Sequence, residues 1–267
     1  MGDAFGRERV MTARATVFTR PTVLGHRGLG RDRVDGLLEN TVESIVAAAH
    51  SGLRWVEFDV RRTADDHLVV GHYPTVDATT FVADLSLEQA RELGAVTLSD
   101  VLDALPAGTG VNLDLKTALE DALRPAATTT AGLLTRVAPD IAADRPLLVS
   151  SFDPAALLVL GEAAPGIPRS LLTWIRFPLR KAIPAAAHLG VDAVAAHWES
   201  FGPNQSDRAP TFRSAAYAVD IAHRAGLTVV AWCPAVPEAR TLLEAGVDAV
   251  VVDDVPRALP ALAGWAD

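Results

Sequence analysis

The sequence predicts an α/β protein, a (β/α)8 barrel, and three observations carry this prediction. Helical segments end at glycine and enter β-rich runs in HSGLRWVEFDV, HLGVDAVAAHW, RAGLTVVAWCP and EAGVDAVVVDD, a pattern typical of helix-to-strand connections. The strand candidates are apolar almost throughout, as parallel strands covered by helices should be. Eight of them alternate with helical segments, and eight parallel strands can close into a barrel.

The expected strands, in chain order, cover residues 22–27, 55–60, 110–115, 146–151, 169–174, 193–198, 228–233 and 249–253. Ala and Leu at helical spacing between them predict the connecting helices, several of which begin after Asp, Ser or Asn. Residues 73–109 are longer than an ordinary connection, so we expect a small excursion there, after strand 2, over the barrel mouth. A doubly wound open sheet is the alternative, but GHRGLG at 25–30 departs from the G-x-G-x-x-G spacing of its phosphate-binding turn.

Chain length and composition indicate one globular domain. The 267 residues are 49% hydrophobic, and no Pro-, Gly- or Ser-rich linker divides them. We expect a flexible N-terminal extension at 1–20 and a single barrel domain at 21–267. The oligomeric state stays open.

Charge and cysteine content exclude several classes of partner. The net charge is −9 and the 24 basic residues are scattered, so no cationic stripe is offered to nucleic acid or anionic lipid. A single cysteine, Cys233, excludes an internal disulfide and fits a reducing compartment. The N-terminus lacks the apolar segment of a signal peptide, and no apolar run is long enough for a membrane span. These features predict a cytoplasmic protein.

The histidines fall into two groups by position. Three of them precede a glycine that ends a helix, and His67 lies in a turn; we interpret these as helix-end or solvent-exposed side chains (His50, His188 and His223 at the helix ends). His26, His72 and His197 instead lie at the carboxyl ends of strands one, two and six. Because the loops after barrel strands build one common rim, these three are predicted to meet there. For His197 a structural role is an equal alternative.

Acidic side chains on strands two and three form a second group. Glu57 and Asp59 are two residues apart in WVEFDVRRT, so both point to the same face of an apolar strand. Asp114 and Lys116 repeat that spacing in VNLDLK. Buried carboxylates repel one another unless a cation lies between them, and oxygen ligands suit Mg²⁺ or Ca²⁺. With Arg27 nearby, these groups predict a small anionic ligand, with phosphate favoured.

In its motifs the chain resembles the glycerophosphodiester phosphodiesterase family. The ordered set is HRG at 26–28, ENT at 39–41, EFDVRRTADDHLVVGH at 57–72, DLSLEQARELG at 84–94, TLSDVLDAL at 97–105 and LDLK at 113–116. Weaker likeness continues through VSSFDP, AWCP and GVDAVVVDDVP to about residue 256. The resemblance implies a (β/α)8 barrel, a divalent metal held by Glu57, Asp59 and Asp114, and catalysis by His26 and His72.

Three departures from the family pattern affect the expected site. His72 is followed by Tyr73 where the family usually has Asp, the third metal ligand is Asp114 where it usually has Glu, and VDATT replaces an acidic-arginine-threonine pattern. The related sphingomyelinase-D-type enzymes look similar in this respect, because they also have Asp at this metal-binding position. Tyr73 and the VDATT segment bear on which alcohol group is accepted.

The expected reaction is metal-dependent cleavage of glycerophosphodiesters to glycerol 3-phosphate and an alcohol. One histidine acts as base and the other as acid, while the cation, with Mn²⁺ a third possibility, and the basic side chains stabilise charge on the phosphate oxygens. The base activates water or the substrate's own neighbouring hydroxyl. Expected substrate contacts come from Arg27, Lys116, Glu39, Asn40, His197, Trp232 and Tyr73. For Glu39 and Asn40, capping of the first helix is the alternative; for Trp232, a place in the core.

Two other classes stay open. A lysophospholipase D or a phosphoinositol-type phosphodiesterase would use the same rim with a wider or more apolar mouth. A non-catalytic relative would bind metal and phosphate without turnover.

Overall fold

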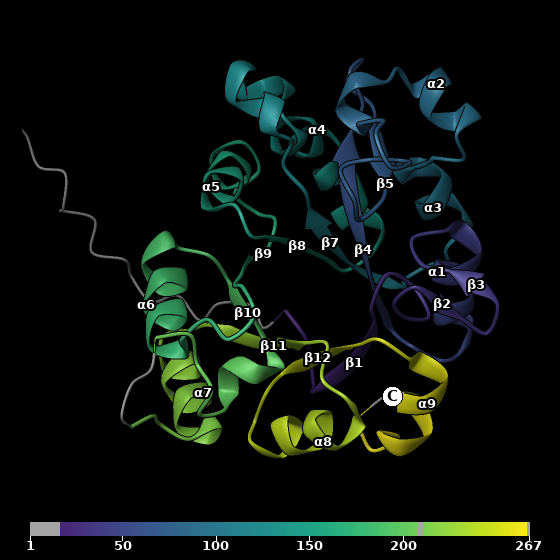
Figure 1. Cartoon of the computed structure of the whole chain (residues 1–267). Coiled ribbons are helices and arrows are strands. Elements are labelled where there is room, and N and C mark those ends of the chain that lie inside the picture. Colours follow the sequence, from purple (N-terminus) through teal and green to yellow (C-terminus); the bar gives the residue numbers. More distant parts are fainter. Residues whose placement is uncertain (1–16, 208–210, 266–267) are drawn as a thin grey trace, which may run out of the picture.

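Eight parallel strands form a closed ring in the computed structural model, which describes residues 17–207 and 211–265 (Figure 1). The ring runs β1 (Thr22–Gly25), β4 (Trp55–Arg62), β7 (Gly110–Leu115), β8 (Leu147–Ser151), β9 (Arg169–Leu172), β10 (Ala193–His197), β11 (Thr228–Trp232) and β12 (Ala249–Val252). It closes because β1 pairs with both β12 and β4. The predicted (β/α)8 barrel is confirmed, and each strand lies within two residues of its expected bounds.

One principal helix follows each strand of the ring on its outside (Figure 1). They are α1 (Val42–His50), α3 (Leu98–Ala104), α4 (Thr130–Asp144), α5 (Pro154–Ala163), α6 (Leu179–Leu189), α7 (Ala215–Arg224), α8 (Val236–Glu244) and α9 (Val255–Ala261). Short elements fill several loops: β2 (Arg33–Val34), β3 (Leu37–Leu38), η2 (Leu119–Leu123), η3 (Ala126–Thr128) and η4 (Trp198–Phe201). Side-chain caps explain several starts; Thr41 caps α1, and Asp153 caps α5 ahead of Pro154.

The excursion after the second barrel strand begins earlier than expected. Its first element is β5 (Leu68–Val70), which pairs antiparallel with β4, and η1 (Val82–Asp84), α2 (Leu87–Glu92) and β6 (Val96–Thr97) follow. The last part of the expected segment is α3, which packs beside α1 as an ordinary barrel helix. The hairpin of β4 and β5 brings His72 back over the ring, because β5 runs opposite to β4.

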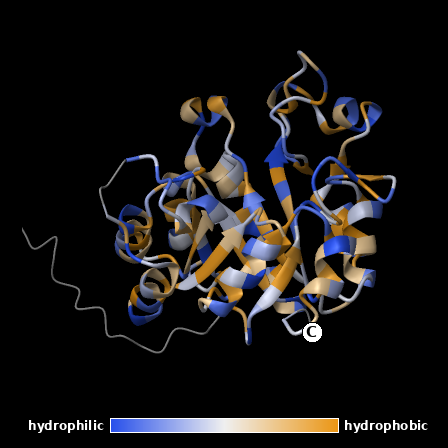
Figure 2. Ribbon diagram, turned by 60° about the horizontal axis from the view of Figure 1, so that its bottom comes forward, coloured by the Kyte–Doolittle hydropathy of each residue, from blue (hydrophilic) through white to orange (hydrophobic). Residues whose placement is uncertain are grey.

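The lower half of the barrel interior is an apolar plug. It contains Leu24, Trp55, Leu148, Ala195, Val230, Ala249 and Val251. The strands are largely orange in Figure 2, as expected for strands that are buried on both faces. Gly110 leaves the space that Trp55 fills, since a Cβ there would lie 2.5 Å from the indole. Such packing is dense and excludes water.

Only part of the expected N-terminal extension can be compared with the structure. Residues 1–16 lie outside the described residues. Phe18 is buried, and its ring meets that of Trp55 edge-on with centroids 4.9 Å apart. The last residues of the expected extension therefore close the bottom of the apolar plug.

Candidate active site

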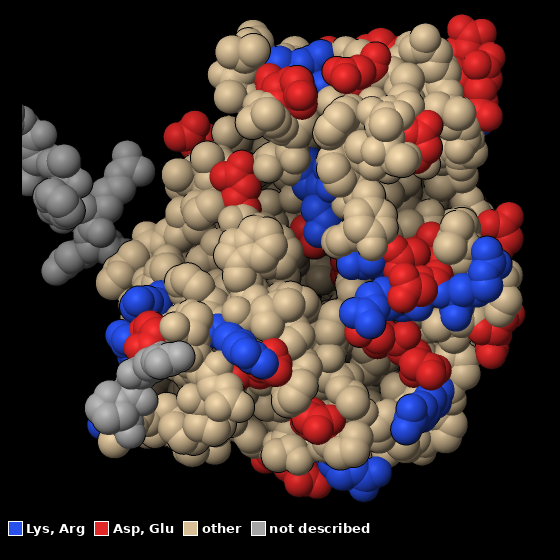
Figure 3. Space-filling view, viewed as in Figure 1, with Lys and Arg blue, Asp and Glu red and all other residues tan. Residues whose placement is uncertain are grey.

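A cavity of about 570 Å³ opens where the barrel strands end. In Figure 3 this face is hollowed near its centre, and Lys or Arg side chains border the hollow. The lining comes from all eight strands of the ring or the loops that follow them, and includes His26, Arg27, Glu57, Arg61, His72, Tyr73, Asp114, Lys116, Phe152, Leu172, Trp174, Ala195, Val230, Trp232, Cys233 and Val251. The alternation along β4 explains the polar floor, because Glu57 and Asp59 share the inward face with Trp55, above the apolar plug.

Three buried carboxylates gather on this floor. Glu57, Asp59 and Asp114 each offer an oxygen within 4.8 Å of those of the other two. Burial raises the pKa of Glu57 to about 7 and also raises that of Asp114. Asp114 Oδ1 is buried and, among the described residues, has no hydrogen-bond partner. An oxygen-only, electron-rich set of this kind suits a hard divalent cation, so the residues fit the metal that the sequence predicts.

The positive charge of Lys116 partly balances the negative charge of the carboxylate cluster. Its Nζ lies 2.9 Å from Asp59 Oδ1 and also contacts Asp114. Burial alone would lower the Lys116 pKa, but Asp114 and Asp59 more than offset it and the pKa rises. Burial would likewise raise the Asp59 pKa, yet the Lys116 charge, followed by His72 and Arg27, holds it below its usual range. Both groups are therefore charged at neutral pH.

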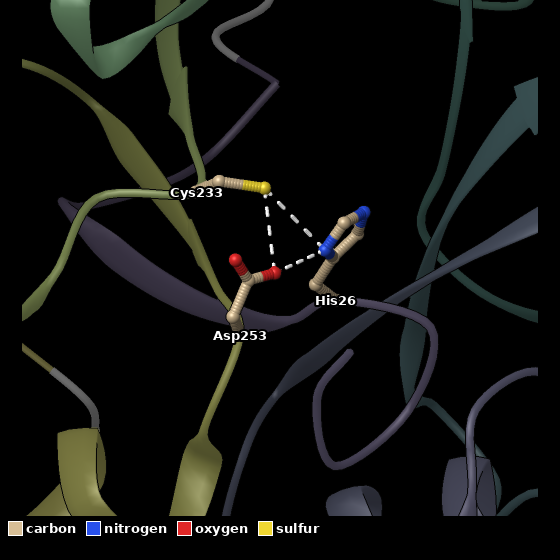
Figure 4. Close-up of side chains that lie close together, drawn as sticks. All are labelled: His26, Cys233 and Asp253. Atoms are coloured by element: carbon tan, nitrogen blue, oxygen red, sulfur yellow. Dashed lines mark hydrogen bonds and ion pairs between the residues drawn. The ribbon is translucent and has the colours of Figure 1, made fainter. Parts of the chain in front are cut away.

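His26 is held by groups from the last two strands. Its Nδ1 lies 2.5 Å from Asp253 Oδ1 and 3.5 Å from Cys233 Sγ (Figure 4). Its Nε2 faces Glu57 Oε2 at 3.8 Å. Burial lowers the His26 pKa, but the Glu57 charge and the hydrogen bond to Asp253 outweigh it, so the pKa is raised well above the usual value. Asp253 thus orients a ring that favours the protonated form.

His72 has a different hydrogen-bond arrangement. Its Nε2 lies 3.2 Å from Arg27 Nη2, and its Nδ1 lies 3.3 Å from both carboxylate oxygens of Asp59. A guanidinium can only donate, so we assign Nε2 as the acceptor and Nδ1 as the protonated nitrogen. Arg61 donates to the backbone oxygen of His72 and fixes the loop.

Glu39 and Asn40 support the site from behind the cavity wall. Glu39 accepts from Arg27 Nη1 at 2.8 Å, and Asn40 donates to Asp59 Oδ2 at 2.8 Å and accepts from the Asp59 backbone. The cap of α1 is Thr41 instead, so the capping alternative is wrong. Asn40 takes a positive φ of 56°, which lets it turn back toward β4. Both residues position charged groups without lining the cavity themselves.

Aromatic side chains form the opposite wall. Phe152 and Trp174 stack with centroids 4.5 Å apart, and Trp232 meets Phe152 edge-on. Tyr73 is 62% exposed at the mouth, with its ring edge-on to His72. His197 lies at the predicted rim, but its ring packs on Trp232 with centroids 4.4 Å apart and does not line the cavity. Its Nδ1 accepts from the Glu199 backbone.

The remaining histidines lie where the sequence places them. His50, His188 and His223 are in the last turns of α1, α6 and α7, and His67 is exposed beside Asp65. None of these four lines the cavity.

Sequence reasoning missed Asp253, Arg61, Phe152 and Trp174. Asp253 directly follows β12, and Phe152 directly follows β8, so the rule that strand ends build the rim would have found them. Arg61 continues the inward alternation from Glu57 and Asp59. Trp174 is the last residue of the expected strand 169–174, so the same rule would have found it, although β9 ends two residues earlier.

Comparison with known families gives one match over most of the chain. The model of the glycerophosphoryl diester phosphodiesterase family matches residues 26–257. A curated glycerophosphodiester phosphodiesterase from Caldanaerobacter subterraneus is 40% identical over 77 residues, 27% of this chain. A bovine glycerophosphodiester phosphodiesterase 1 is 37% identical over 97 residues, 33% of this chain. The matched segments span only 30% and 28% of those relatives.

Solved structures share the fold at low identity. A putative glycerophosphodiester phosphodiesterase from Galdieria sulphuraria superposes with a TM-score of 0.75 at 21% identity, covering 92% of this chain and 99% of that one. An Oleispira antarctica phosphodiesterase, solved with its product sn-glycerol-3-phosphate, has a TM-score of 0.70 at 23% identity and covers 91% and 97%. Within residues 17–207 and 211–265, no helix has the length and apolar character that crossing a bilayer requires.

Proposed function

The chain belongs to the glycerophosphoryl diester phosphodiesterase family, and from this premise we propose that it hydrolyses glycerophosphodiesters to glycerol 3-phosphate and an alcohol. One observation carries the proposal: two histidines from separate strand ends approach two different members of a single buried carboxylate cluster. His26 Nε2 faces Glu57, and His72 Nδ1 faces Asp59. This arrangement places two imidazoles, one able to act as acid and the other as base, in one cavity. The carboxylates beside them can hold a cation, which would in turn bind the phosphate of the substrate.

Glu57, Asp59 and Asp114 are the residues that would hold the divalent cation. Their oxygen donors favour Mg²⁺ or Ca²⁺, with Mn²⁺ also accommodated. When bound, the cation supplies Lewis-acid stabilisation of charge on a phosphoryl oxygen.

Arg27 and Lys116 bind the remaining phosphate oxygens. Both line the cavity and are held by Asp59. Because Lys116 Nζ has three donors and Arg27 a planar fork, each can keep a carboxylate contact and still donate to a phosphate. Glu39 and Asn40 keep this pair of charges in place, which lowers the reorganisation needed when substrate binds.

His26 is assigned as the general acid and His72 as the general base. The raised pKa of His26, due to Glu57 and Asp253 against the effect of burial, favours an imidazolium that donates its Nε2 proton to the leaving alkoxide. His72 accepts at Nε2, the atom that now takes a hydrogen bond from Arg27. It withdraws a proton from water, or from the substrate's neighbouring hydroxyl to give a cyclic phosphate.

The aromatic wall binds the alcohol group. Trp232 Nε1 is buried and has no hydrogen-bond partner among the described residues, which supports a donor role toward substrate. Trp174, which is 67% exposed and stacks on Phe152, can offer a ring face to a cationic head group such as choline. His197 supports Trp232 from behind, so its expected substrate contact becomes an indirect one.

A second candidate substrate class is lysophospholipid, favoured by the apolar mouth. Trp174 and Ile175 are 67% and 53% exposed beside the cavity, and such side chains suit an acyl chain.

The cytoplasmic location expected from the sequence is retained as part of this proposal.

The test is release of glycerol phosphate from glycerophosphocholine, glycerophosphoethanolamine and glycerophosphoinositol, and release of acylglycerol phosphate from a detergent-dispersed lysolipid. The protein is first chelated and then supplied with Mg²⁺, Ca²⁺ or Mn²⁺. We expect turnover that returns only with metal. Metal binding without release from any of the four substrates would favour the non-catalytic relative and refute the proposal.

A further inference from the structure

We propose that His26, Cys233 and Asp253 form a second metal site, selective for Zn²⁺ or a similar thiophilic divalent ion, and that occupation of this site inhibits the enzyme. The three side chains project toward a common point from the ends of β1, β11 and β12 (Figure 4). The binding part of the proposal is independent of the reaction. The inhibitory part rests on the proposed function.

The spacing of the three donor atoms matches a tetrahedral ion. Zn–N and Zn–O bonds of about 2.0 Å and a Zn–S bond of about 2.3 Å place ligand atoms about 3.3 to 3.5 Å apart. Cys233 Sγ lies 3.5 Å from His26 Nδ1 and 3.3 Å from Asp253 Oδ1. Only the Nδ1–Oδ1 distance of 2.5 Å is short, because those two atoms are hydrogen-bonded to each other. An ion bound between them replaces this hydrogen bond, and the two atoms then separate by the needed fraction of an ångström.

The donor set differs from that of the carboxylate cluster. Nitrogen, sulfur and oxygen donors suit Zn²⁺, whereas Glu57, Asp59 and Asp114 offer oxygen only. Binding displaces the Cys233 thiol proton and the His26 Nδ1 proton to buffer. A thiolate and the Asp253 carboxylate then balance the two charges of the ion, so the site becomes neutral.

The site is accessible from solvent and leaves a fourth position open. His26 and Cys233 line the cavity, and the Asp253 side chain is 29% exposed. An ion can therefore enter through the cavity and complete its shell with water. Cys233 takes a positive φ of 55°, which turns its side chain back toward β1 and β12.

Inhibition follows because the proposed Zn²⁺ site and the proposed active site use the same imidazole, that of His26. A metal on Nδ1 keeps the ring neutral and replaces the hydrogen bond to Asp253. The ring then holds a proton on Nε2 only as a neutral imidazole, which is a far weaker acid than the imidazolium. The His26 ring can therefore hold the soft ion or act as general acid, but not both.

The binding test uses Co²⁺, a spectroscopic substitute for Zn²⁺, with the carboxylate cluster saturated by Mg²⁺. We expect a thiolate-to-cobalt charge-transfer band in the wild type that Zn²⁺ abolishes. Cys233→Ser removes the chain's single thiolate and should lose the band. Asp253→Asn should keep the band but bind at least about tenfold more weakly. His223→Ala is the matched control, because it removes a surface His–Asp pair of 2.9 Å and should change nothing.

The inhibition test measures turnover against Zn²⁺ at saturating Mg²⁺. With inhibition expressed relative to each protein's own turnover without Zn²⁺, Cys233→Ser should require at least about tenfold more Zn²⁺ for half-inhibition. Equal Zn²⁺ sensitivity in wild type and Cys233→Ser, or no thiolate band in the wild type, would overturn the proposal. If the protein turned over no glycerophosphodiester, the cobalt spectrum would still decide the binding site, so the two failures are distinguishable.

Discussion

Replacement of Glu57 by Gln should make the metal-free protein more stable and the metal-loaded protein less so. Gln keeps the size of the side chain and can still accept from the Arg27 backbone, as Glu57 does at 3.0 Å. It removes a charge that is 4% exposed and lies near two other carboxylates. The opposite signs with and without metal would separate a ligand role from a purely structural one.

The magnitude follows from the pKa of Glu57, which burial raises from 4.5 to about 7. One pKa unit corresponds to about 1.4 kcal/mol, so the ionised form costs the folded protein about 3 kcal/mol. The folded state holds the proton more tightly than the unfolded chain. Wild-type stability therefore falls as pH rises from 4.5 through about 7. The gain from Gln should be near zero at low pH and approach about 3 kcal/mol above neutrality.

The assay is denaturant unfolding in chelator at acid and alkaline pH, repeated with saturating Ca²⁺ or Mg²⁺. With metal, only the wild type has its full ligand set, so ligand linkage should reverse the order of stability. Asp121→Asn is the matched control, because Asp121 pairs with buried Arg62 at 2.6 Å outside the carboxylate cluster. It should lose stability whether or not metal is present. A Glu57→Gln variant that is less stable than wild type at alkaline pH in chelator, or that binds metal equally well, would refute the reasoning.

Three further predictions concern catalysis. His26→Ala and His72→Ala should each lower kcat by about 10² to 10⁴ in the glycerol phosphate release assay, whereas His223→Ala stays near wild type; equal damage from all three in folded proteins would contradict the rim argument. Lys116→Gln should weaken substrate binding and slow turnover, because a cation facing the phosphate is lost; unchanged KM and kcat would remove Lys116 from the anion site. Tyr73→Asp should lower kcat/KM for the preferred substrate if the ring lines the alcohol pocket, and a uniform gain across all four substrates would show that a family-like carboxylate is simply missing.

The fold was predictable because helical segments and apolar runs alternate along the sequence in the same order in which helices and parallel strands alternate in the barrel. Glycine at the helix ends and apolar runs of five or six residues located all eight strands to within two residues. The excursion was harder to delimit. Its first strand, Leu68–Val70, is only three residues long, so its pairing with β4 depends on tertiary context that local pattern does not contain.

Much of the site was predictable from the rule that strand ends share a rim. That rule brought His26 and the three carboxylates to one cavity. His72 was expected at the end of the second strand, but it reaches the cavity by following β5, which runs back along β4. It did not specify which of the rim groups touch, because side-chain direction after a strand depends on loop conformation. Asn40 and Cys233 illustrate this, because a positive φ turns each of their side chains inward. The identity of neither residue predicts this backbone conformation.

Barrel closure has a consequence for how the chain acquires activity. His26 and its partner Asp253 are 227 positions apart, so the proposed general acid leaves the ribosome long before the carboxylate that orients its ring. Until β12 inserts between β1 and β11, the nascent chain carries both proposed catalytic histidines, but His26 lacks the Asp253 carboxylate that holds its ring. Contacts of such long sequence separation form late and slowly. Enzymatic competence should thus arise in one step when β12 joins the ring, and chains interrupted before β12 should release no glycerol phosphate.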